Sequence, residues 1–443
     1  MKKINLLFVS LLLVGCNNNN SSSNRYSGAW QNILAKSFMT TDNVKVEAFN
    51  TVMTLKYFIE ESVEDKESLI NDVTSIYQDN VSDYHKKFDR HYSYYLDHND
   101  KEKGLYTNIR DVNKSLDSGK FVKLNEDTYN LLKFSVDATK YSECYFNIFV
   151  GELTDFWDDM FSNYSSSLSE EEWIAFLNNE PYYNEITRET IQKIVDSIPS
   201  TSEEVNQVIE FNDETKEVRF NSLKDSNGES KGKISISVGG VAKGYATDLL
   251  KEKLLEKGYD KGYLFSGASS ILSLGEPIYN NSKGQALSVL DPRTSHLFGE
   301  QQKKAFSINL KDAFSMSTSG NYTSGKSYTF KDLETNEIVT RHHIINSFTG
   351  YPKYEDNVAS VSVFSKKLSA GLLDVFSTTL VNKSIEDGLE FRKKVMNDYE
   401  ADLEIVYILE DLDKNTIEIV STSTFNDTLV IGDQEGVSIR YES

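Results

Sequence analysis

The 443-residue sequence predicts an α+β fold, with largely antiparallel sheets and helices packed on them. Two kinds of pattern lead to this prediction. Short runs typical of strands occur at residues 44–60, where the residues alternate, and at 262–275 and 286–291. Residues 208–220 and 403–420 each contain two such runs around a polar turn, which is typical of an antiparallel hairpin. Stretches with helical spacing separate these strands, so helices and sheets must share one core.

Four of these stretches repeat apolar residues at helical spacing and are predicted helices: 64–98, 124–141, 190–198 and 368–381. A fifth stretch, residues 162–185, is rich in Ser and Glu, with Trp173 and Phe176 at helical spacing. We expect it to be a surface insertion that contains a short helix.

Residues 234–258 are the most informative part of the chain. Ile234 and Ile236 alternate with serines and predict a strand with one buried face. A glycine-containing loop follows at 238–244. From Tyr245 onward the apolar residues have helical spacing, with Gly258 as an expected C-cap. The segment therefore predicts strand, glycine loop and helix.

Such a layout can bind a phosphate. Glycines allow the backbone to approach closely, the helix N-terminus offers free N–H groups, and Lys243 adds a positive charge. The loop lacks both the Walker pattern GxxxxGK[ST] and the dinucleotide pattern GxGxxG. The alternatives are an ordinary turn, whose glycines serve packing, and a solvated lysine at a helix start.

The composition limits the possible partners. A formal net charge of -21 argues against nucleic acid and against a basic membrane-binding surface. An anionic ligand would need a local cation, a helix N-terminus or a bound metal. Only Cys144 remains in the body of the chain besides Cys16 in the leader, so an internal disulfide and a CxxC metal site are excluded.

The first residues are typical of a bacterial export signal. Residues 1–16 combine two lysines with an apolar run too short to span a bilayer, and they end in Leu-Val-Gly-Cys. This ending resembles the lipobox of bacterial lipoproteins, which implies cleavage before Cys16 and lipid modification of its thiol. A plain secretory signal is the alternative. Residues 17–40, which begin with an Asn/Ser tract, are the expected flexible tether, and 41–443 the folded domain.

Two further constellations carry oxygen and nitrogen ligands. Asp374 and Thr378 are four residues apart on a predicted helix, so both project from one face. A carboxylate with a hydroxyl suits a hard ion such as Mg²⁺. His342 and His343 stand at a strand end, where only one of the two can face inward. A histidine there is either a satisfied core residue or a general base with a pKa near neutral.

Several blocks together indicate a family. The segment GGVAKGYATD resembles the GGIAKGYAxD core of the ApbE-type FAD:protein FMN transferases. Residues 145–157 resemble the family's GxFDPTVGPLxxLW segment. STSGNY at 317–322, HHIINSFTGYP at 342–352 and AGLLDVFSTTL at 370–380 are similar to its STSGDY, HHIIDPxTGYP and ADAxxTAL motifs. The blocks occur in the family's order, and the resemblance implies an ApbE-like flavin transferase fold.

The resemblance also implies roles for individual residues. Mg²⁺ would be held by Asp374, Thr378 and the backbone carbonyl of Gly240, and His343 would be the inward-facing general base. The residues implied in FAD binding are Lys243, Ser237, Tyr145, Phe146, Asn147 and Ile345. Ser237, Asn147 and Ser270 depart from the family pattern, because each stands where the family has Asp.

The implied activity is Mg²⁺-dependent transfer of FMN from FAD to a Thr or Ser hydroxyl of an acceptor protein, with release of AMP. The implied setting is the outer face of a bacterial cell membrane, with the protein lipid-anchored and its acceptor extracytoplasmic. Two alternatives stay open: a Mg²⁺-dependent FAD pyrophosphatase, with water as the acceptor, and a non-catalytic flavin-binding surface lipoprotein.

Overall fold

A computed structural model describes most of the chain. The described residues are 26–97, 99–163, 169–267, 269–279, 284–294, 302–322, 326–331, 338–352, 357–425, 427–432 and 435–442. Cys16, the predicted signal peptide and the Asn/Ser tract of the tether lie outside them. Within these residues no helix is both long and apolar enough to cross a bilayer.

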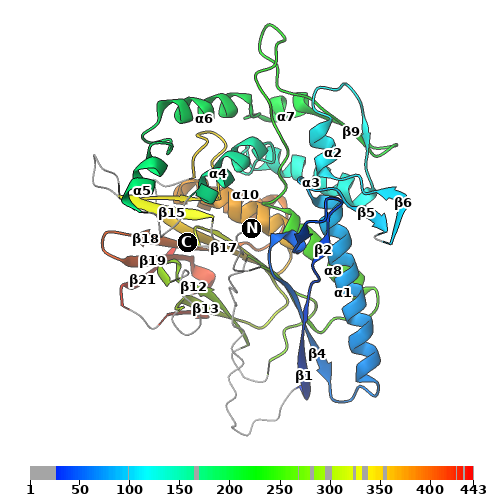
Figure 1. Cartoon of the computed structure of the whole chain (residues 1–443). Coiled ribbons are helices and arrows are strands. Elements are labelled where there is room, and N and C mark those ends of the chain that lie inside the picture. Colours follow the sequence, from blue (N-terminus) through cyan, green and yellow to red (C-terminus); the bar gives the residue numbers. More distant parts are fainter. Residues whose placement is uncertain are drawn as a thin grey trace.

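A nine-stranded sheet forms the centre of the molecule (Figure 1). All neighbours in it pair antiparallel except β19 and β21, which pair parallel. In spatial order its strands are β1 Gly28–Leu34, β4 Met53–Glu60, β10 Gly262–Ser266, β11 Ser270–Ser273, β14 Ser315–Gly320, β17 Val358–Ser365, β18 Glu404–Asp411, β19 Thr416–Thr422 and β21 Val437–Glu442. The predicted antiparallel character is confirmed.

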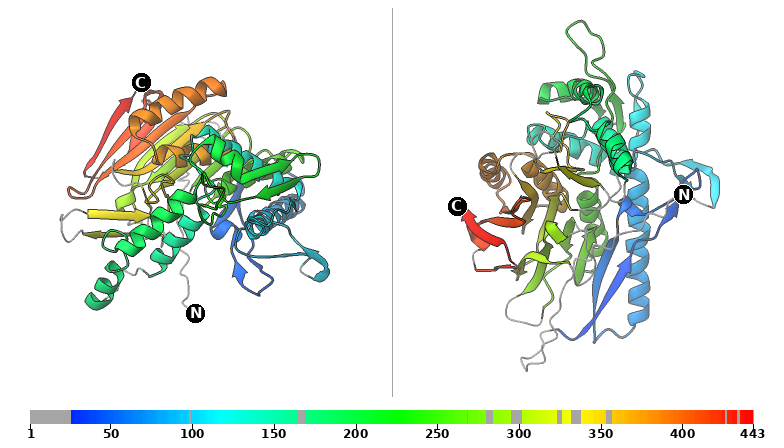
Figure 2. Two further views of the ribbon diagram at one scale, coloured as in Figure 1. Left: turned by 90° about the horizontal axis from the view of Figure 1, so that it is seen from above. Right: turned by 60° about the vertical axis from the view of Figure 1, so that its left-hand side comes forward.

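The helices pack mainly on one face of this sheet. Their bounds are α1 Lys66–Phe88, α2 Ile109–Lys114, α3 Glu126–Tyr141, α4 Gly151–Asn163, α5 Glu170–Leu177, α6 Glu185–Ser197, α7 Ser202–Val208, α8 Ala242–Leu255, α9 Ala370–Val381 and α10 Ile385–Asp398. α8 packs on β10 and β11, α9 packs on β14 and β17, and the two helices contact each other. α1 and the C-terminal strands lie on opposite sides of the molecule in Figures 1 and 2.

Smaller sheets complete the fold. They are β12 Gln285–Leu290 with β13 Lys304–Leu310 and β20 Leu429–Ile431; β7 Val122–Lys123 with β9 Glu217–Phe220 and β8 Ile209–Asn212; β15 Ser327–Lys331 with β16 Ile338–His342; β2 Phe38–Met39 with β3 Lys45–Val46; and β5 Tyr95–Asp97 with β6 Asp100–Leu105.

The strand periodicity divides the core in two. On β10 and β11, Leu264 and Leu272 belong to the cluster beneath the helices. Their neighbours Tyr263 and Ile271 belong to a second cluster with the apolar residues of β12 and β13. Successive side chains of a strand point to opposite faces. The large sheet therefore lies between a helical layer and a small sheet, and both of its faces are buried.

Residues 234–237 differ from their prediction. Ile234 and Ile236 are buried as expected, but this extended segment makes one isolated bridge, between Ser235 and Val150, instead of a ladder. The Asn113 side chain takes the place of a partner strand. Its amide donates to the Ile236 carbonyl and accepts from the Ile236 N–H, at 3.0 and 2.7 Å. Alternation alone could not distinguish this pairing from a ladder.

Two predicted boundaries also change. The helix predicted over 64–98 ends at Phe88, because the chain turns there into the short β5–β6 hairpin. The stretch 17–40 was predicted to be a tether, yet β1 lies within it and pairs with β4 along its whole length. Folded structure thus begins before residue 41.

The insertion at 162–185 contains the predicted short helix, α5. Its description as a surface segment is wrong in one respect, because Phe176, Leu177 and Glu180 are buried. Phe176 packs edge-on against Tyr328 of β15, with 5.0 Å between the ring centroids. The insertion therefore covers the β15–β16 hairpin.

Candidate active site

Asp374 lies at the centre of the candidate site. It projects from α9 toward the start of α8 and is only 4% exposed. Its Oδ1 accepts hydrogen bonds from the hydroxyls of Ser270 and Ser317 at 2.6 and 2.7 Å, and its Oδ2 accepts from the Gly244 N–H at 2.7 Å. Burial raises the pKa of this carboxyl, whereas the charge of Lys243 and the three hydrogen bonds lower it.

Thr378 and the glycine loop lie beside this carboxylate. Thr378 follows Asp374 by one helical turn, is partly exposed, and contacts the Ser319 hydroxyl at 3.3 Å. Gly240 is exposed, and a Cβ built on it would lie 3.7 Å from the Thr378 Oγ1. The fold thus brings together the three residues predicted to hold a metal, although Asp374 and Thr378 follow Gly240 by 134 and 138 residues along the chain.

The donor set fits a hard cation. The described residues contain no cluster of three or more His, Cys, Asp and Glu side chains that could hold a metal. A single carboxylate, a hydroxyl and an accessible backbone segment are the oxygen donors that Mg²⁺ uses together with substrate phosphates. Within the described chain Asp374 forms no salt bridge, so a bound cation would neutralise an otherwise unpaired buried charge.

The start of α8 offers positive potential. Its N-cap residue, Val241, provides no side-chain cap. The Ala242 N–H donates to the Val238 carbonyl and the Gly244 N–H to Asp374, whereas the Lys243 N–H between them has no acceptor among the described residues. Lys243, in the first turn, is partly exposed and acts electrostatically on both Asp374 and His343. An anion placed here would meet a helix N-terminus and a lysine together.

The two histidines are arranged differently from the prediction, which made His343 the inward residue. His342, the last residue of β16, is buried, and its Nδ1 accepts from the Ile344 N–H at 3.2 Å. His343 is exposed and makes no hydrogen bond to the described residues. Desolvation by the surrounding protein, then the charges of His342, Lys326 and Lys243, lower the pKa of His343. The ring is therefore neutral near pH 7 and accessible.

Of the six residues predicted to bind the flavin, four lie on two adjoining loops, at positions 145–147 and 345. Asn382 joins these loops, because its amide nitrogen lies 3.2 Å from the carbonyl oxygen of Tyr145 and 3.5 Å from that of Ile345. The Lys383 ammonium lies 3.8 Å from the centroid of the partly exposed Tyr145 ring. Phe146 is buried against the Gly240 loop, 3.2 Å from a Cβ built there.

Asn147 and Ser237 take different positions. Asn147 is buried and supports the loop from inside, donating to the Pro199 carbonyl at 2.8 Å and accepting from the Phe149 N–H at 3.0 Å. Ser237 is partly exposed beside the glycine loop, and its N–H donates to the Ile148 carbonyl at 2.7 Å. Ser237 is thus available to a ligand, whereas the Asn147 amide is already used.

Comparison with known proteins now decides the family. The model of the ApbE family matches residues 49–403. The chain belongs to the ApbE family. No curated protein sequence gives a match. The predicted family and the α+β class are both confirmed.

Solved structures of ApbE proteins share the fold. The ApbE protein of Thermotoga maritima aligns with a TM-score of 0.58 and 18% identity, over 90% of this chain and 98% of that one. The flavin transferase ApbE of Vibrio cholerae gives 0.55 and 14%, over 90% and 99%. The flavinyl transferase ApbE of Pseudomonas stutzeri gives 0.53 and 14%, over 91% and 98%.

Sequence reasoning overlooked one residue of this ApbE-family site. Asp248 on α8 accepts from the Ala370 and Gly371 N–H groups, both at 2.8 Å, and so joins α8 to the start of α9. It closes the segment AKGYATD and lies four residues after Gly244, on the same helical face. That spacing is the signal that could have revealed it.

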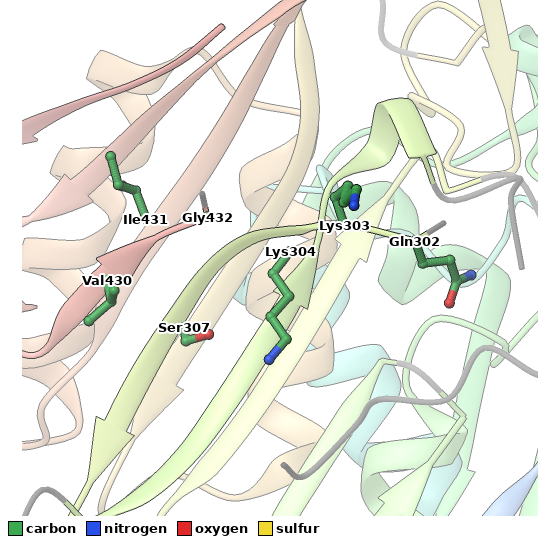
Figure 3. Close-up of a pocket in the computed structure, with 7 residues that line it drawn as sticks. All are labelled: Gln302, Lys303, Lys304, Ser307, Val430, Ile431 and Gly432. Atoms are coloured by element: carbon green, nitrogen blue, oxygen red, sulfur yellow. The ribbon is translucent and has the colours of Figure 1, made fainter. Parts of the chain in front are cut away.

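A separate hollow of about 310 Å³ lies on the small sheet, away from these residues. Figure 3 shows its lining, which includes Lys304 and Ser307 of β13 and the exposed Val430 and Ile431 of β20. It shares no residue with the candidate site. Two of the residues predicted to bind the flavin, Phe146 and Ser237, instead lie against the accessible glycine loop.

Proposed function

We propose that this ApbE-family protein transfers FMN from FAD to a Thr or Ser hydroxyl of an acceptor protein, in a Mg²⁺-dependent reaction that releases AMP. The observation that carries the proposal is the convergence of Asp374, Thr378, Gly240, Lys243 and the accessible His343 on one glycine loop. Family membership and the flavin transferase names of the Vibrio and Pseudomonas relatives support the same reaction class.

The pyrophosphate of FAD requires local compensation in a chain with a net charge of -21. Mg²⁺ on Asp374, Thr378 and the Gly240 carbonyl would act as a Lewis acid and neutralise charge on the phosphates and the departing AMP. Lys243 and the N-terminus of α8 add positive potential that is fixed before the substrate binds. Ser270 and Ser317 orient Asp374, and their hydrogen bonds oppose the rise in its pKa that burial causes.

His343 is assigned the role of general base. A neutral imidazole nitrogen accepts the proton of the attacking hydroxyl. The hydroxyl oxygen forms a bond to the FMN-side phosphorus, and the bond from that phosphorus to the bridging oxygen breaks. The bridging oxygen leaves with AMP. The lowered pKa of His343 keeps its ring unprotonated at neutral pH, and the exposure of the ring allows a protein acceptor to approach.

The setting of the reaction is part of the proposal. Cleavage before Cys16 and lipid modification of its thiol would anchor the protein to the outer face of a bacterial membrane. The acceptor would then be an extracytoplasmic protein. Mass spectrometry of the mature protein tests this directly, because an unmodified N-terminus or cleavage elsewhere would contradict the anchor.

The reaction itself is tested with purified soluble protein, FAD, Mg²⁺ and an acceptor domain carrying a Thr or Ser site. The acceptor is weighed by mass spectrometry, and AMP is measured by chromatography. The expected result is a gain of one FMN on the acceptor, lost with EDTA or in Asp374→Ala. Asp196→Ala, at an exposed position on α6, is the control for a lost carboxylate.

Other outcomes separate the alternatives. FMN and AMP free in solution, with no gain on any acceptor supplied, would favour the pyrophosphatase. FAD that binds and stays intact would favour the non-catalytic flavin-binding protein. Unchanged turnover in Asp374→Ala would remove the metal assignment even if transfer occurs.

A further inference from the structure

Glu180 is a fully buried carboxylate that the proposed chemistry does not use. It belongs to the insertion at 162–185, in the turn that follows α5, and is 0% exposed. Its Oε1 accepts from the Nε of Arg341 at 2.8 Å and from the Tyr328 hydroxyl at 3.3 Å. Its Oε2 accepts from the Tyr182 N–H at 2.6 Å. Both carboxylate oxygens therefore have partners.

Arg341 is equally enclosed, with a side chain 6% exposed. Its guanidinium carbon lies 5.6 Å from the ring of Trp157, 6.0 Å from that of Phe330 and 5.3 Å from that of Tyr351. Trp157 in turn donates from Nε1 to the Gly350 carbonyl at 2.8 Å. The aromatic rings and Glu180 thus surround one cation completely.

This enclosure holds both ends of the loop that carries His343. Arg341 lies two residues before His343, and Tyr351 closes the same loop. Between them the Asn346 N–H donates to the Tyr351 carbonyl, and the Gly350 N–H donates to the Asn346 carbonyl, both at 2.8 Å. His343 itself has no hydrogen bond to the described residues, so the loop ends determine where its ring lies.

We propose that Glu180 is a positioning residue for His343, acting through its buried ion pair with Arg341. The inference rests on the proposed function for its catalytic readout, and it gives the insertion a role in that function. A purely stabilising role explains the charges poorly, because apolar residues of similar volume often stabilise a protein as well as a buried ion pair does. Directed hydrogen bonds, in contrast, fix the end of β16 in one place.

The test compares Glu180→Gln, the double variant Glu180→Leu/Arg341→Met, and a matched control. The control is Glu404→Gln, which breaks another largely buried pair, between Glu404 and Arg392 at 3.0 Å. Neither residue belongs to the candidate site or to the loop that carries His343. For each protein, kcat and KM for FMN transfer, FAD affinity and stability in urea are measured. The double variant removes the ion pair without leaving a lone buried charge.

We expect kcat to fall about tenfold or more in Glu180→Gln, because a misplaced general base loses part of its roughly 10²- to 10⁴-fold contribution. FAD affinity should stay unchanged. In the double variant stability should recover while kcat stays low, and Glu404→Gln should keep full kcat despite its lost stability. A kcat that follows stability across all variants, or a wild-type kcat in the double variant, would overturn the proposal.

A second readout does not depend on turnover. The imidazole resonances of ¹⁵N-labelled His343, assigned with His343→Gln, report its surroundings and its titration. Glu180→Gln should shift them and broaden them, whereas Glu404→Gln should leave them in place. If the wild-type protein transfers no FMN, the proposed function is wrong, but the positioning role is not contradicted by that result. Unchanged His343 resonances in Glu180→Gln would overturn the positioning role.

Discussion

The backbone N–H of Gly244 donates a hydrogen bond of 2.7 Å to the carboxylate of Asp374, across 130 residues of chain. Contact this close is possible only because residue 244 lacks a side chain. A Cβ built on it would lie 2.3 Å from the Ala370 carbonyl oxygen and 2.8 Å from the Asp374 Cγ. The glycine therefore sets the distance between the loop and α9.

We predict that Gly244→Ala separates α8 from α9. Relieving these contacts should cost about 1–3 kcal/mol of stability, the usual range for an overpacked core. Transfer activity should fall by more than the loss of folded protein explains. Asp374 would lose the hydrogen bond from the residue 244 N–H, and it would lie farther from Gly240. Urea unfolding and the Mg²⁺ dependence of transfer measure the two effects.

Gly239→Ala is the control, since a Cβ there meets only the Ser237 Oγ, at an ordinary 3.7 Å. It should keep its stability and most of its activity. Equal losses in both variants would contradict the proposed role of Gly244.

The hydroxyls of Ser270 and Ser317 share one oxygen of Asp374, and this leads to a second prediction. Ser270→Ala removes a hydrogen bond to a charged group, worth about 1.5–3 kcal/mol. The pKa of Asp374 should rise further, and more Mg²⁺ should be needed for half-maximal activity. The midpoint of a Mg²⁺ titration at constant pH measures this.

Ser288→Ala is a suitable comparison, because Ser288 pairs with Ser307 on the small sheet. It should leave the Mg²⁺ midpoint unchanged. Ser270→Asp would add a second carboxylate against Asp374, and the repulsion should favour protonation without Mg²⁺ and tighter Mg²⁺ binding with it.

Much of the site was predictable because its residues are local in sequence. Asp374 and Thr378 share a helical face at a spacing of four, and Lys243 follows directly after a glycine loop. The antiparallel sheet was predictable from alternation at β4 and from the two runs around a polar turn that became β18 and β19. These signals depend on the period of a helix or strand alone.

The remaining features depend on partners that are distant in sequence. The ladder expected at Ile236 is replaced by the Asn113 side chain, 123 residues away. Glu180 reads as one more acidic residue in a polar insertion until Arg341, 161 residues later, is placed against it. His343 was expected to face inward, and the end of β16 at His342 reversed the order. Tertiary contacts of this kind leave no periodic pattern.

Asp248 gives a third prediction, concerning pH. Burial raises its pKa from 3.8 to about 6, so between these values the folded protein holds a proton that the unfolded chain has released. The stability that the protonated Asp248 carboxyl contributes to the folded state is thus fully present below pH 3.8 and is lost as the pH rises through 6. Asp248→Asn should remove this pH dependence. It should also lower stability by about 1–3 kcal/mol, since one oxygen cannot replace two acceptors for the Ala370 and Gly371 amides.

Urea unfolding at pH 5 and at pH 8 measures both effects. The difference in stability between the two pH values should shrink in Asp248→Asn relative to wild type. Asp196→Asn, at an exposed carboxylate that accepts from Gln192, should leave the difference as it is. An Asp248→Asn protein as stable as wild type would show that α9 does not depend on the hydrogen bonds that Asp248 accepts from its first two amides.

The last prediction concerns the acid limb of the rate profile. A general base works when it is unprotonated, and the lowered pKa of His343 places its limb in kcat/KM below the ordinary histidine value of 6.5. Asp374, with a raised pKa, adds a second acid limb, because it binds Mg²⁺ only when ionised. Raising the Mg²⁺ concentration should move the Asp374 limb to lower pH and leave the His343 limb in place.

Lys326 identifies the His343 limb. It is exposed, pairs with Asp158 at 3.0 Å and is one of the charges that lower the His343 pKa. Lys326→Gln should therefore move the limb to higher pH at saturating Mg²⁺. Lys331→Gln, at the exposed last residue of the strand that follows Lys326, should not. Since protonated His343 is inactive, the activity that Lys326→Gln loses should be confined to the acid side of the profile, and its activity at pH 8 should be unchanged. A limb unmoved by Lys326→Gln, or still present in His343→Gln at saturating Mg²⁺, would assign the base to another residue.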